Sequence, residues 1–147
     1  MKDSLNIAIA GATGYIGLQL IKILLRHPKV KILYLCATKS IGKSVHLFDK
    51  EIVSKKLPKI TKLERVNWKK VNVLFTALPN GEAQKIIKRL PKNVKLIDLS
   101  ADFRLEDYKK FKQWYGINHS AKQLIKDSIY AVTELSKNKI KKYRIIS

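Results

Sequence analysis

The sequence predicts an α/β fold in which parallel strands alternate with helices. A β-branched run near its start leads into a glycine-rich turn and then into a segment with helical apolar spacing. A later run at 71–77 is almost continuously apolar, which is typical of a strand covered by helices on both faces, and a further strand is expected in the run at 94–99. Helical patterns follow both runs, so the expected architecture is a doubly wound parallel sheet.

The first strand is expected at residues 7–10, and the turn after it carries Gly11, Gly14 and Gly17. In a dinucleotide site the first glycine permits the tight turn, the second lets the backbone approach a pyrophosphate, and the third lets helix and strand pack closely. The helix through 18–25 would offer its free amides and positive dipole end to the phosphates. We therefore predict a Rossmann nucleotide site, with a glycine turn that binds no ligand as the alternative. The predicted site consists of Gly11, Ala12, Thr13, Gly14, Tyr15, Ile16 and Gly17.

The end of the second strand, expected at 31–36, bears on the choice of cofactor. A site selective for NAD places an acidic residue about 20 positions past the glycines, where it binds the ribose 2′-hydroxyl. Residues 37–40 read Ala-Thr-Lys-Ser and hold no carboxylate. Thr38 and Lys39 are suited to a 2′-phosphate instead, so we predict NADP(H), with an ordinary polar loop as the alternative.

Residues 37–44, A-T-K-S-I-G-K-S, also fit a relaxed phosphate-loop pattern of nucleoside triphosphatases. The pattern lacks its first glycine, which would allow close approach of a phosphate, and it follows the second strand rather than the first. We therefore disfavour an ATPase or kinase. Val45 and Ile52 are expected to lie on one or two amphipathic turns after this loop.

Two turns in the second half are expected at the carboxyl end of the sheet, where ligands bind in doubly wound folds. The strand at 71–77 is followed by a turn into a helix at 82–90, so Leu78 and Pro79 are predicted to face the nicotinamide or ribose. The strand at 94–99 is followed by three candidates for a substrate pocket that binds an anion, Ser100, Asp102 and Arg104. The alternative is a helix-capping turn in which Asp102 pairs with Arg104.

The remaining elements are a helix near 106–112, a polar helix near 121–126, a short helix to about 142 and a strand starting at Arg144. Ser136 is expected to cap the last helix. Tyr108 and Lys112 form a Y-x-x-x-K pair of the kind that short-chain dehydrogenases use, but it follows the preceding strand too closely. That class, or an epimerase, is kept as an alternative.

Composition limits the classes of function. The chain of 147 residues has a net charge of +20, but its lysines greatly outnumber its arginines and are scattered, so specific nucleic-acid binding is not expected. We expect no membrane segment, no metal site and one domain over 1–147. The single cysteine, Cys36, excludes an intrachain disulfide and suits the cytoplasm.

Four motifs occur in order along the chain: G-A-T-G-Y-I-G at 11–17, A-L-P-N-G at 77–81, I-D-L-S-A-D-F-R at 97–104 and W-Y-G-x-x-H at 114–119. With them the chain resembles the N-acetyl-gamma-glutamyl-phosphate reductases of arginine biosynthesis, which are related to the aspartate-semialdehyde dehydrogenases. The resemblance implies NADPH-dependent reduction of a small acyl phosphate, N-acetyl-L-glutamyl 5-phosphate, to its semialdehyde. A cysteine thiolate attacks the acyl phosphate in that family, and a later histidine acts as acid and base.

The family's nucleophilic cysteine is expected beyond Ser147, so this sequence predicts no catalytic residue of its own. Cys36 is predicted to be a small buried side chain in the adenosine half of the fold. The resemblance implies an N-terminal Rossmann domain without the catalytic domain, inactive alone, whose full-length form is a homo-oligomer. A non-catalytic NAD(P)-binding sensor that regulates a partner is the alternative from another class.

Overall fold

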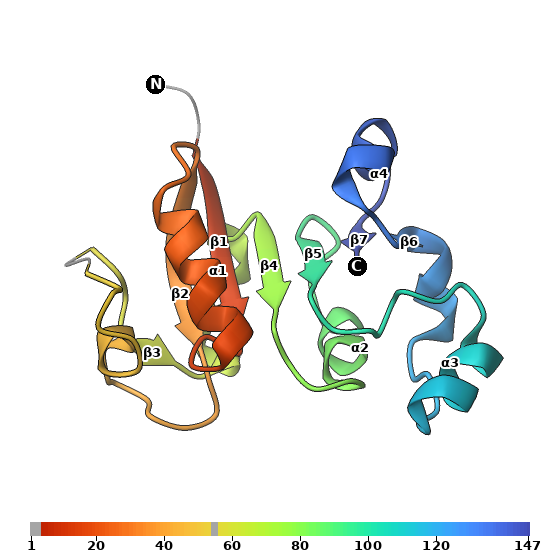
Figure 1. The fold of residues 1–147 in the computed structure, drawn as a ribbon, viewed down its shortest axis with the longest axis horizontal. Helices are drawn as coiled ribbons and strands as arrows, with labels where there is room; N and C mark the ends of the chain where they lie inside the picture. Colours follow the sequence, from red (N-terminus) through yellow and green to blue (C-terminus); the bar gives the residue numbers. More distant parts are fainter. Residues whose placement is uncertain (1–3, 54–55) are drawn as a thin grey trace. The chain divides into compact units, whose positions relative to one another are not determined.

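The computed structural model describes residues 4–53 and 56–147. The described residues up to 77 form one compact unit and residues 78–147 form a second. Within those described ranges, no helix is long and apolar enough to cross a membrane. Both units combine parallel strands with helices, which confirms the predicted α/β class (Figure 1).

In the first unit the strand order is β3-β2-β1-β4, and each pair of neighbours is parallel. Helix α1 and the segment after β2 bury their apolar side chains against β1 and β2, which gives a core that includes Ile7, Ile21, Leu35, Val45 and Ile52. The elements in chain order are β1 (Leu5–Ala10), α1 (Tyr15–Leu25), β2 (Val30–Cys36), η1 (Val45–Leu47), β3 (Ile60–Thr61), η2 (Leu63–Arg65), η3 (Trp68–Lys70) and β4 (Val73–Thr76).

In the second unit β7 lies between β5 and β6 and pairs in parallel with both. The buried side chains include Leu96 of β5, Ile145 of β7 and two aromatic rings, Phe103 and Phe111. The elements in chain order are α2 (Glu82–Ile87), β5 (Lys95–Asp98), α3 (Tyr108–Tyr115), η4 (Lys122–Asp127), β6 (Ser128–Ile129), α4 (Thr133–Ile140) and β7 (Ile145–Ile146).

Some predicted boundaries are wrong. Helix α3 begins at Tyr108 rather than near 106, because the Asp107 side chain accepts a hydrogen bond from the Lys109 amide and caps it. Ser136 does not cap α4 but lies within it, and its amide donates to the carbonyl of Val132. The strands β3 and β6 were not predicted, since two residues are too few to show a periodic pattern.

Candidate functional site

The glycine turn joins β1 to α1 as the sequence predicts, and each of its glycines has a different environment. Gly11 has a φ of +84°, in the left-handed region that favours glycine. A Cβ on Gly17 would lie 2.2 Å from the Gly11 carbonyl oxygen, so only glycine lets α1 approach the turn this closely. The predicted reasons for these two glycines are confirmed.

Gly14 is different because neither its backbone nor its packing requires glycine. Its φ is −79°, it is exposed, and a Cβ there would make an ordinary contact of 3.5 Å with the Gly11 oxygen. It is the N-cap of α1, and the amides of Tyr15, Ile16 and Gly17 that follow have no acceptor within the helix. Tyr15 and Ile16 are exposed, so this eleven-residue helix opens with backbone donors of the kind that bind phosphate groups.

The predicted 2′-phosphate loop is joined to the glycine turn through the end of β2. The amides of Gly11 and Ala12 both donate to the carbonyl of Cys36, at 3.0 and 3.1 Å. The next residues, Thr38 and Lys39, are exposed. The structure therefore brings the glycine turn and this pair into the same part of the first unit.

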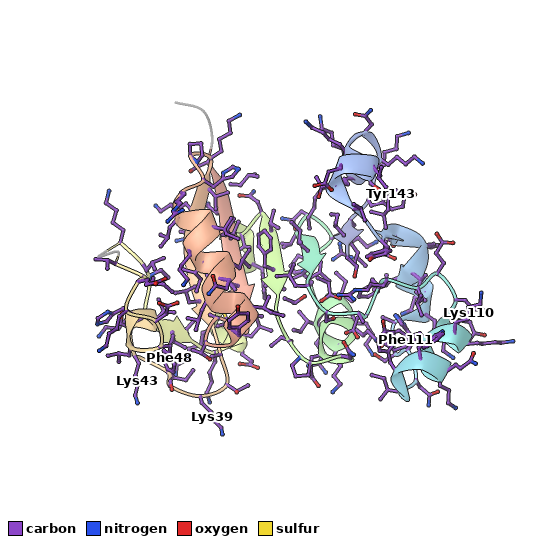
Figure 2. All side chains as sticks on the ribbon, in the orientation of Figure 1. Lys39, Lys43, Phe48, Lys110, Phe111 and Tyr143 are labelled. Carbon is purple, nitrogen blue, oxygen red and sulfur yellow. The ribbon has the colours of Figure 1, made fainter. Side chains whose placement is uncertain are left out.

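Residues 37–43 form a loop that is held at both ends. The Ala37 amide donates to the Thr61 carbonyl at 3.1 Å, and the Gly42 amide donates to the Ile60 carbonyl at 2.8 Å. Lys39 and Lys43 extend outwards from this loop (Figure 2). A triphosphatase phosphate loop leads into a helix, whereas this one leads only into the three-residue turn η1, so the structure gives that alternative no support.

Cys36 cannot serve as a reactive thiol in this environment. Its residue is 2% exposed, and burial raises the pKa of its thiol to about 12. Since the thiolate is the nucleophilic form, almost none is present near neutral pH. This agrees with its predicted role as a small buried side chain.

In the second unit the Asp102 carboxylate caps helix α2. Gly81 is the N-cap of α2 and has no side chain to accept from the first amides. Asp102, 21 residues further along the chain, supplies the missing acceptor. Its Oδ1 accepts from the Gly81 amide at 2.6 Å and its Oδ2 accepts from the Gln84 amide at 3.2 Å. Asp102 is fully buried, so these hydrogen bonds occupy a carboxylate that water does not reach.

The other two substrate-pocket candidates differ from each other. The Ser100 hydroxyl is buried and lies 2.9 and 2.8 Å from the two carboxylate oxygens of Asp98, and it accepts from the Asp102 amide at 3.2 Å. Arg104 follows at the end of the same turn and is exposed. Asp102 is directed to α2, so the predicted pairing of Asp102 with Arg104 is not the arrangement in the structure.

His119 joins this cluster from the loop after α3. Its Nδ1 accepts from the Ala121 amide at 3.2 Å, and its Nε2 therefore carries the proton and donates to the Asp102 carbonyl at 2.8 Å. The rings of Phe103 and Phe111 pack against its ring in a T-shaped arrangement, with ring centroids at 5.3 and 5.1 Å. Burial lowers the pKa of His119, although Asp102 acts in the opposite direction.

Gln84 connects the same elements and was missed in the sequence. It is fully buried, its Nε2 donates to Asp102 Oδ1 at 3.0 Å, and its Oε1 accepts from the Ser120 amide at 2.6 Å. Only its position three residues after the N-cap glycine could have indicated it. Three motifs thus meet around Asp102: the turn at 77–81, the strand and turn at 97–104, and the loop at 114–119.

The remaining predicted residues of this unit lie outside that cluster. Leu78 is partly buried and Pro79 is exposed at the start of the turn before α2. The ammonium of Lys122 lies over the ring of Tyr108, 4.3 Å from its centroid. Among the described residues, no group of three His, Cys, Asp or Glu side chains is placed to hold a metal ion.

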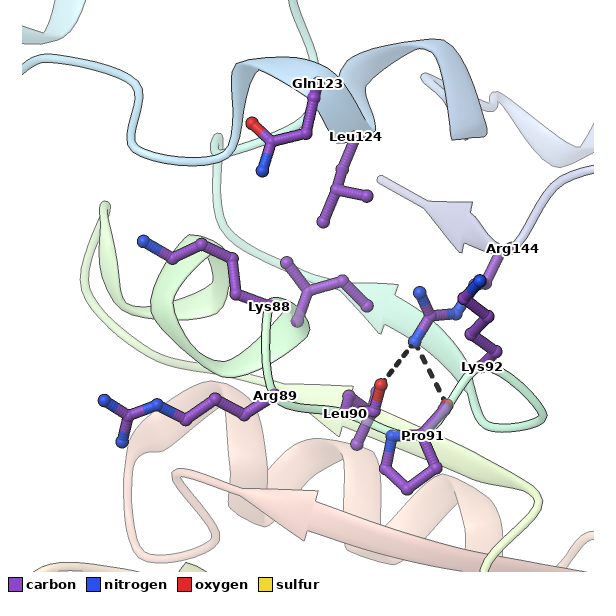
Figure 3. Close-up of a pocket in the computed structure, with 9 residues that line it drawn as sticks. Lys88, Arg89, Leu90, Pro91, Lys92, Gln123, Leu124 and Arg144 are labelled. Atoms are coloured by element: carbon purple, nitrogen blue, oxygen red, sulfur yellow. Dashed lines mark hydrogen bonds between the residues drawn. The ribbon is translucent and has the colours of Figure 1, made fainter.

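A shallow pocket of about 400 Å³ lies beyond the end of α2 and is lined by basic side chains that include Lys88, Arg89, Lys92 and Arg144 (Figure 3). The Arg144 guanidinium is occupied, because its Nη2 donates to the carbonyls of Leu90 and Pro91 at 2.8 and 3.0 Å. It holds β7 to the end of α2, so Arg144 has a structural role here.

Comparison with known proteins gives consistent matches. Residues 6–143 match the family described as semialdehyde dehydrogenase, NAD binding domain. N-acetyl-gamma-glutamyl-phosphate reductase of Ehrlichia ruminantium is 41% identical over 149 residues, and the match covers 100% of this chain and 43% of that protein. The reductase of Paracoccus denitrificans is 35% identical, with coverage of 98% and 42%.

The chain therefore spans less than half the length of these relatives. Among solved structures, aspartate semialdehyde dehydrogenase II of Vibrio cholerae superposes with a TM-score of 0.64 at 20% identity. That match covers 99% of this chain and 38% of the other, and at this identity it supports the fold alone.

Proposed function

Because the chain belongs to the semialdehyde dehydrogenase family, through its NAD-binding domain, we propose that it is the cofactor-binding part of an N-acetyl-gamma-glutamyl-phosphate reductase. The reaction would be the NADPH-dependent reduction of N-acetyl-L-glutamyl 5-phosphate to N-acetyl-L-glutamate 5-semialdehyde, with release of phosphate, in arginine biosynthesis. The main support is the 41% identity to such a reductase over the whole chain.

The glycine turn would hold the pyrophosphate of NADP(H). Gly14 is exposed and makes no contact that excludes a side chain, which supports a position kept free for close approach of a ligand. The amides of Tyr15, Ile16 and Gly17 would donate to the phosphate oxygens. Thr38 and Lys39 would bind the 2′-phosphate, since no carboxylate occupies 37–40 to bind a free 2′-hydroxyl. When bound, the cofactor supplies the hydride.

In the second unit we assign different roles to the three substrate-pocket candidates. Arg104 is exposed and would bind the anionic group of the substrate. Ser100 and Asp102 are occupied by internal hydrogen bonds and would fix the turn from which Arg104 extends. Leu78 and Pro79 would face the nicotinamide or ribose.

Cys36 would not be the nucleophile, because its thiol is buried and its pKa is about 12. As it is the one cysteine of the sequence, the attacking thiolate would come from protein outside these 147 residues. We accordingly expect no reductase turnover from residues 1–147 alone. A cytoplasmic location and a homo-oligomeric full-length form are part of this proposal.

A hybrid protein tests the proposal. Residues 1–147 would replace the matching part of the Ehrlichia ruminantium reductase, and NADPH oxidation would be followed with the acyl phosphate. We expect turnover by the hybrid and none by residues 1–147 or by the relative's remaining part alone. A folded hybrid that binds NADPH but shows no turnover would contradict the proposal and would favour the non-catalytic sensor.

A further inference from the structure

The turn before α2 contains an asparagine followed by glycine, Asn80-Gly81, and Asn80 is exposed. This pair is the one in which an asparagine most readily loses ammonia, because glycine has no Cβ to hinder attack by its own amide nitrogen. We propose that Asn80 is a spontaneous deamidation site and that the buried Asp102 carboxylate restrains the reaction. The inference is independent of the reaction proposed above.

The reaction needs the Gly81 nitrogen to lose its proton and attack Cγ of Asn80. The new N–Cγ bond closes a succinimide, the Cγ–Nδ2 bond breaks, and ammonia leaves with the proton. Water then opens the ring at either carbonyl, which gives aspartate or isoaspartate at position 80. Water is the only other reactant.

Both reacting groups are held by hydrogen bonds in the folded chain. The Gly81 N–H donates to Asp102 Oδ1 at 2.6 Å, and removal of its proton would leave an anionic nitrogen facing a carboxylate. The Asn80 carboxamide is held separately, since its Oδ1 accepts from the Ala101 amide at 3.2 Å. Attack by the Gly81 nitrogen would require its hydrogen bond to Asp102 to open.

The local structure explains why Gly81 of this labile pair is not easily replaced by another residue. Gly81 has a φ of +91°, and a Cβ there would lie 3.1 Å from Cδ1 of Ile117. A larger residue would be strained by its backbone and crowded by that side chain. The restraint by Asp102 therefore protects a turn that depends on glycine.

Deamidation would damage the turn that it occurs in. An aspartate at position 80 adds a negative charge close to the carboxylate that caps α2, and isoaspartate also adds a backbone atom to the turn. We expect Asn80→Asp to lower the melting temperature of the chain.

Peptide mapping by mass spectrometry measures the rate at Asn80 in residues 1–147 near neutral pH at physiological temperature. We expect the folded chain to react at least roughly tenfold more slowly than the same chain unfolded in urea, as expected for loss of one charge-assisted hydrogen bond. Asp102→Asn should remove most of this protection in chain shown by circular dichroism to be folded. Asp107→Asn removes the same charge from the carboxylate that caps α3, 2.7 Å from the Lys109 amide, and should leave the rate unchanged.

Equal rates in folded and unfolded wild-type chain would overturn the proposal, as would a folded Asp102→Asn variant that reacts as slowly as wild type. If that variant does not fold, hydrogen exchange of the Gly81 amide in wild-type chain decides. Strong protection of this amide supports the proposal, and exchange at the rate of an unfolded chain contradicts it.

Discussion

The carbonyl oxygen of Gly11 occupies the space in which a side chain on Gly17 would begin, since a Cβ there would lie 2.2 Å from that oxygen. This contact sets how closely α1 approaches the turn after β1, and therefore where the first amides of the helix lie. Gly14, three residues earlier, has room for a Cβ at 3.5 Å from the same oxygen. Glycine is thus needed at position 17 for packing of the fold, whereas at position 14 it is proposed to be needed for approach of the cofactor.

We expect Gly17→Ala to affect mainly stability and Gly14→Ala to affect mainly cofactor binding. Gly17→Ala should lower the free energy of unfolding by about 1–3 kcal/mol, because backbone rather than a flexible side chain must move to admit the methyl group. Gly14→Ala should change stability by less than about 0.5 kcal/mol but weaken NADPH binding about tenfold or more. Urea unfolding and NADPH titration measure the two effects. If Gly14→Ala binds NADPH normally, the backbone at Gly14 does not approach the cofactor.

The choice between NADPH and NADH tests the role of Lys39. Lys39→Ala should weaken NADPH binding roughly tenfold, because one charge-assisted contact to the 2′-phosphate is lost. It should leave NADH binding unchanged. Lys43→Ala removes an equal charge from the same exposed loop and is the matched control. An equal loss of affinity in both variants would indicate a general effect of charge instead of a 2′-phosphate contact.

Gln84 should be important for stability because it connects two segments in the interior of the second unit. Gln84→Met keeps the approximate size of the side chain but leaves the Ser120 amide and one Asp102 hydrogen bond without a partner. We expect a loss of about 1–3 kcal/mol in the free energy of unfolding. Gln113→Met, at an exposed position of α3, should change stability by less than about 0.5 kcal/mol. Similar values for both variants would mean that the Gln84 hydrogen bonds contribute little.

His119 should make the stability of the chain sensitive to acid. Its pKa in the folded chain is lowered from 6.5, mainly by burial, with Lys122 acting in the same direction and Asp102 opposing it. Below pH 6.5 the unfolded chain binds the proton more readily, so stability should fall as the pH falls from 6.5 towards the lowered pKa of the folded chain. Above 6.5 this group contributes no pH dependence.

Urea unfolding at a series of pH values measures this effect. His119→Gln should flatten the dependence just below pH 6.5, whereas His46→Gln, at an exposed position, should leave it intact. A dependence that persists unchanged in folded His119→Gln would assign the acid sensitivity to other groups.

The strand, turn and helix of the first unit could be predicted because each residue pattern acts locally. The apolar run of β1, the glycines of the turn and the spacing of α1 all indicate the same local structure. Gly11 and Gly17 have the roles that their positions predict, one through its φ and the other through close packing. The strands β3 and β6 could not be predicted, since their pairing depends on neighbours far along the chain.

The cluster around Asp102 was harder to predict for the same reason. A carboxylate, a serine and an arginine after a strand suggested a pocket, but a sequence does not show which side chains point inwards. The structure directs Asp102 to the helix N-terminus 21 residues earlier and leaves Arg104 exposed. Gln84 has no signal of its own, because its function depends on two partners that are distant in sequence.

Binding of NADP(H) by the glycine turn can be measured on residues 1–147 by titration calorimetry with NADPH and with NADH. We expect saturable binding of one NADPH per chain, with NADH weaker by about tenfold or more. Failure of folded chain to bind NADPH would contradict the nucleotide site, and equal affinity for NADH would contradict the 2′-phosphate contacts of Thr38 and Lys39.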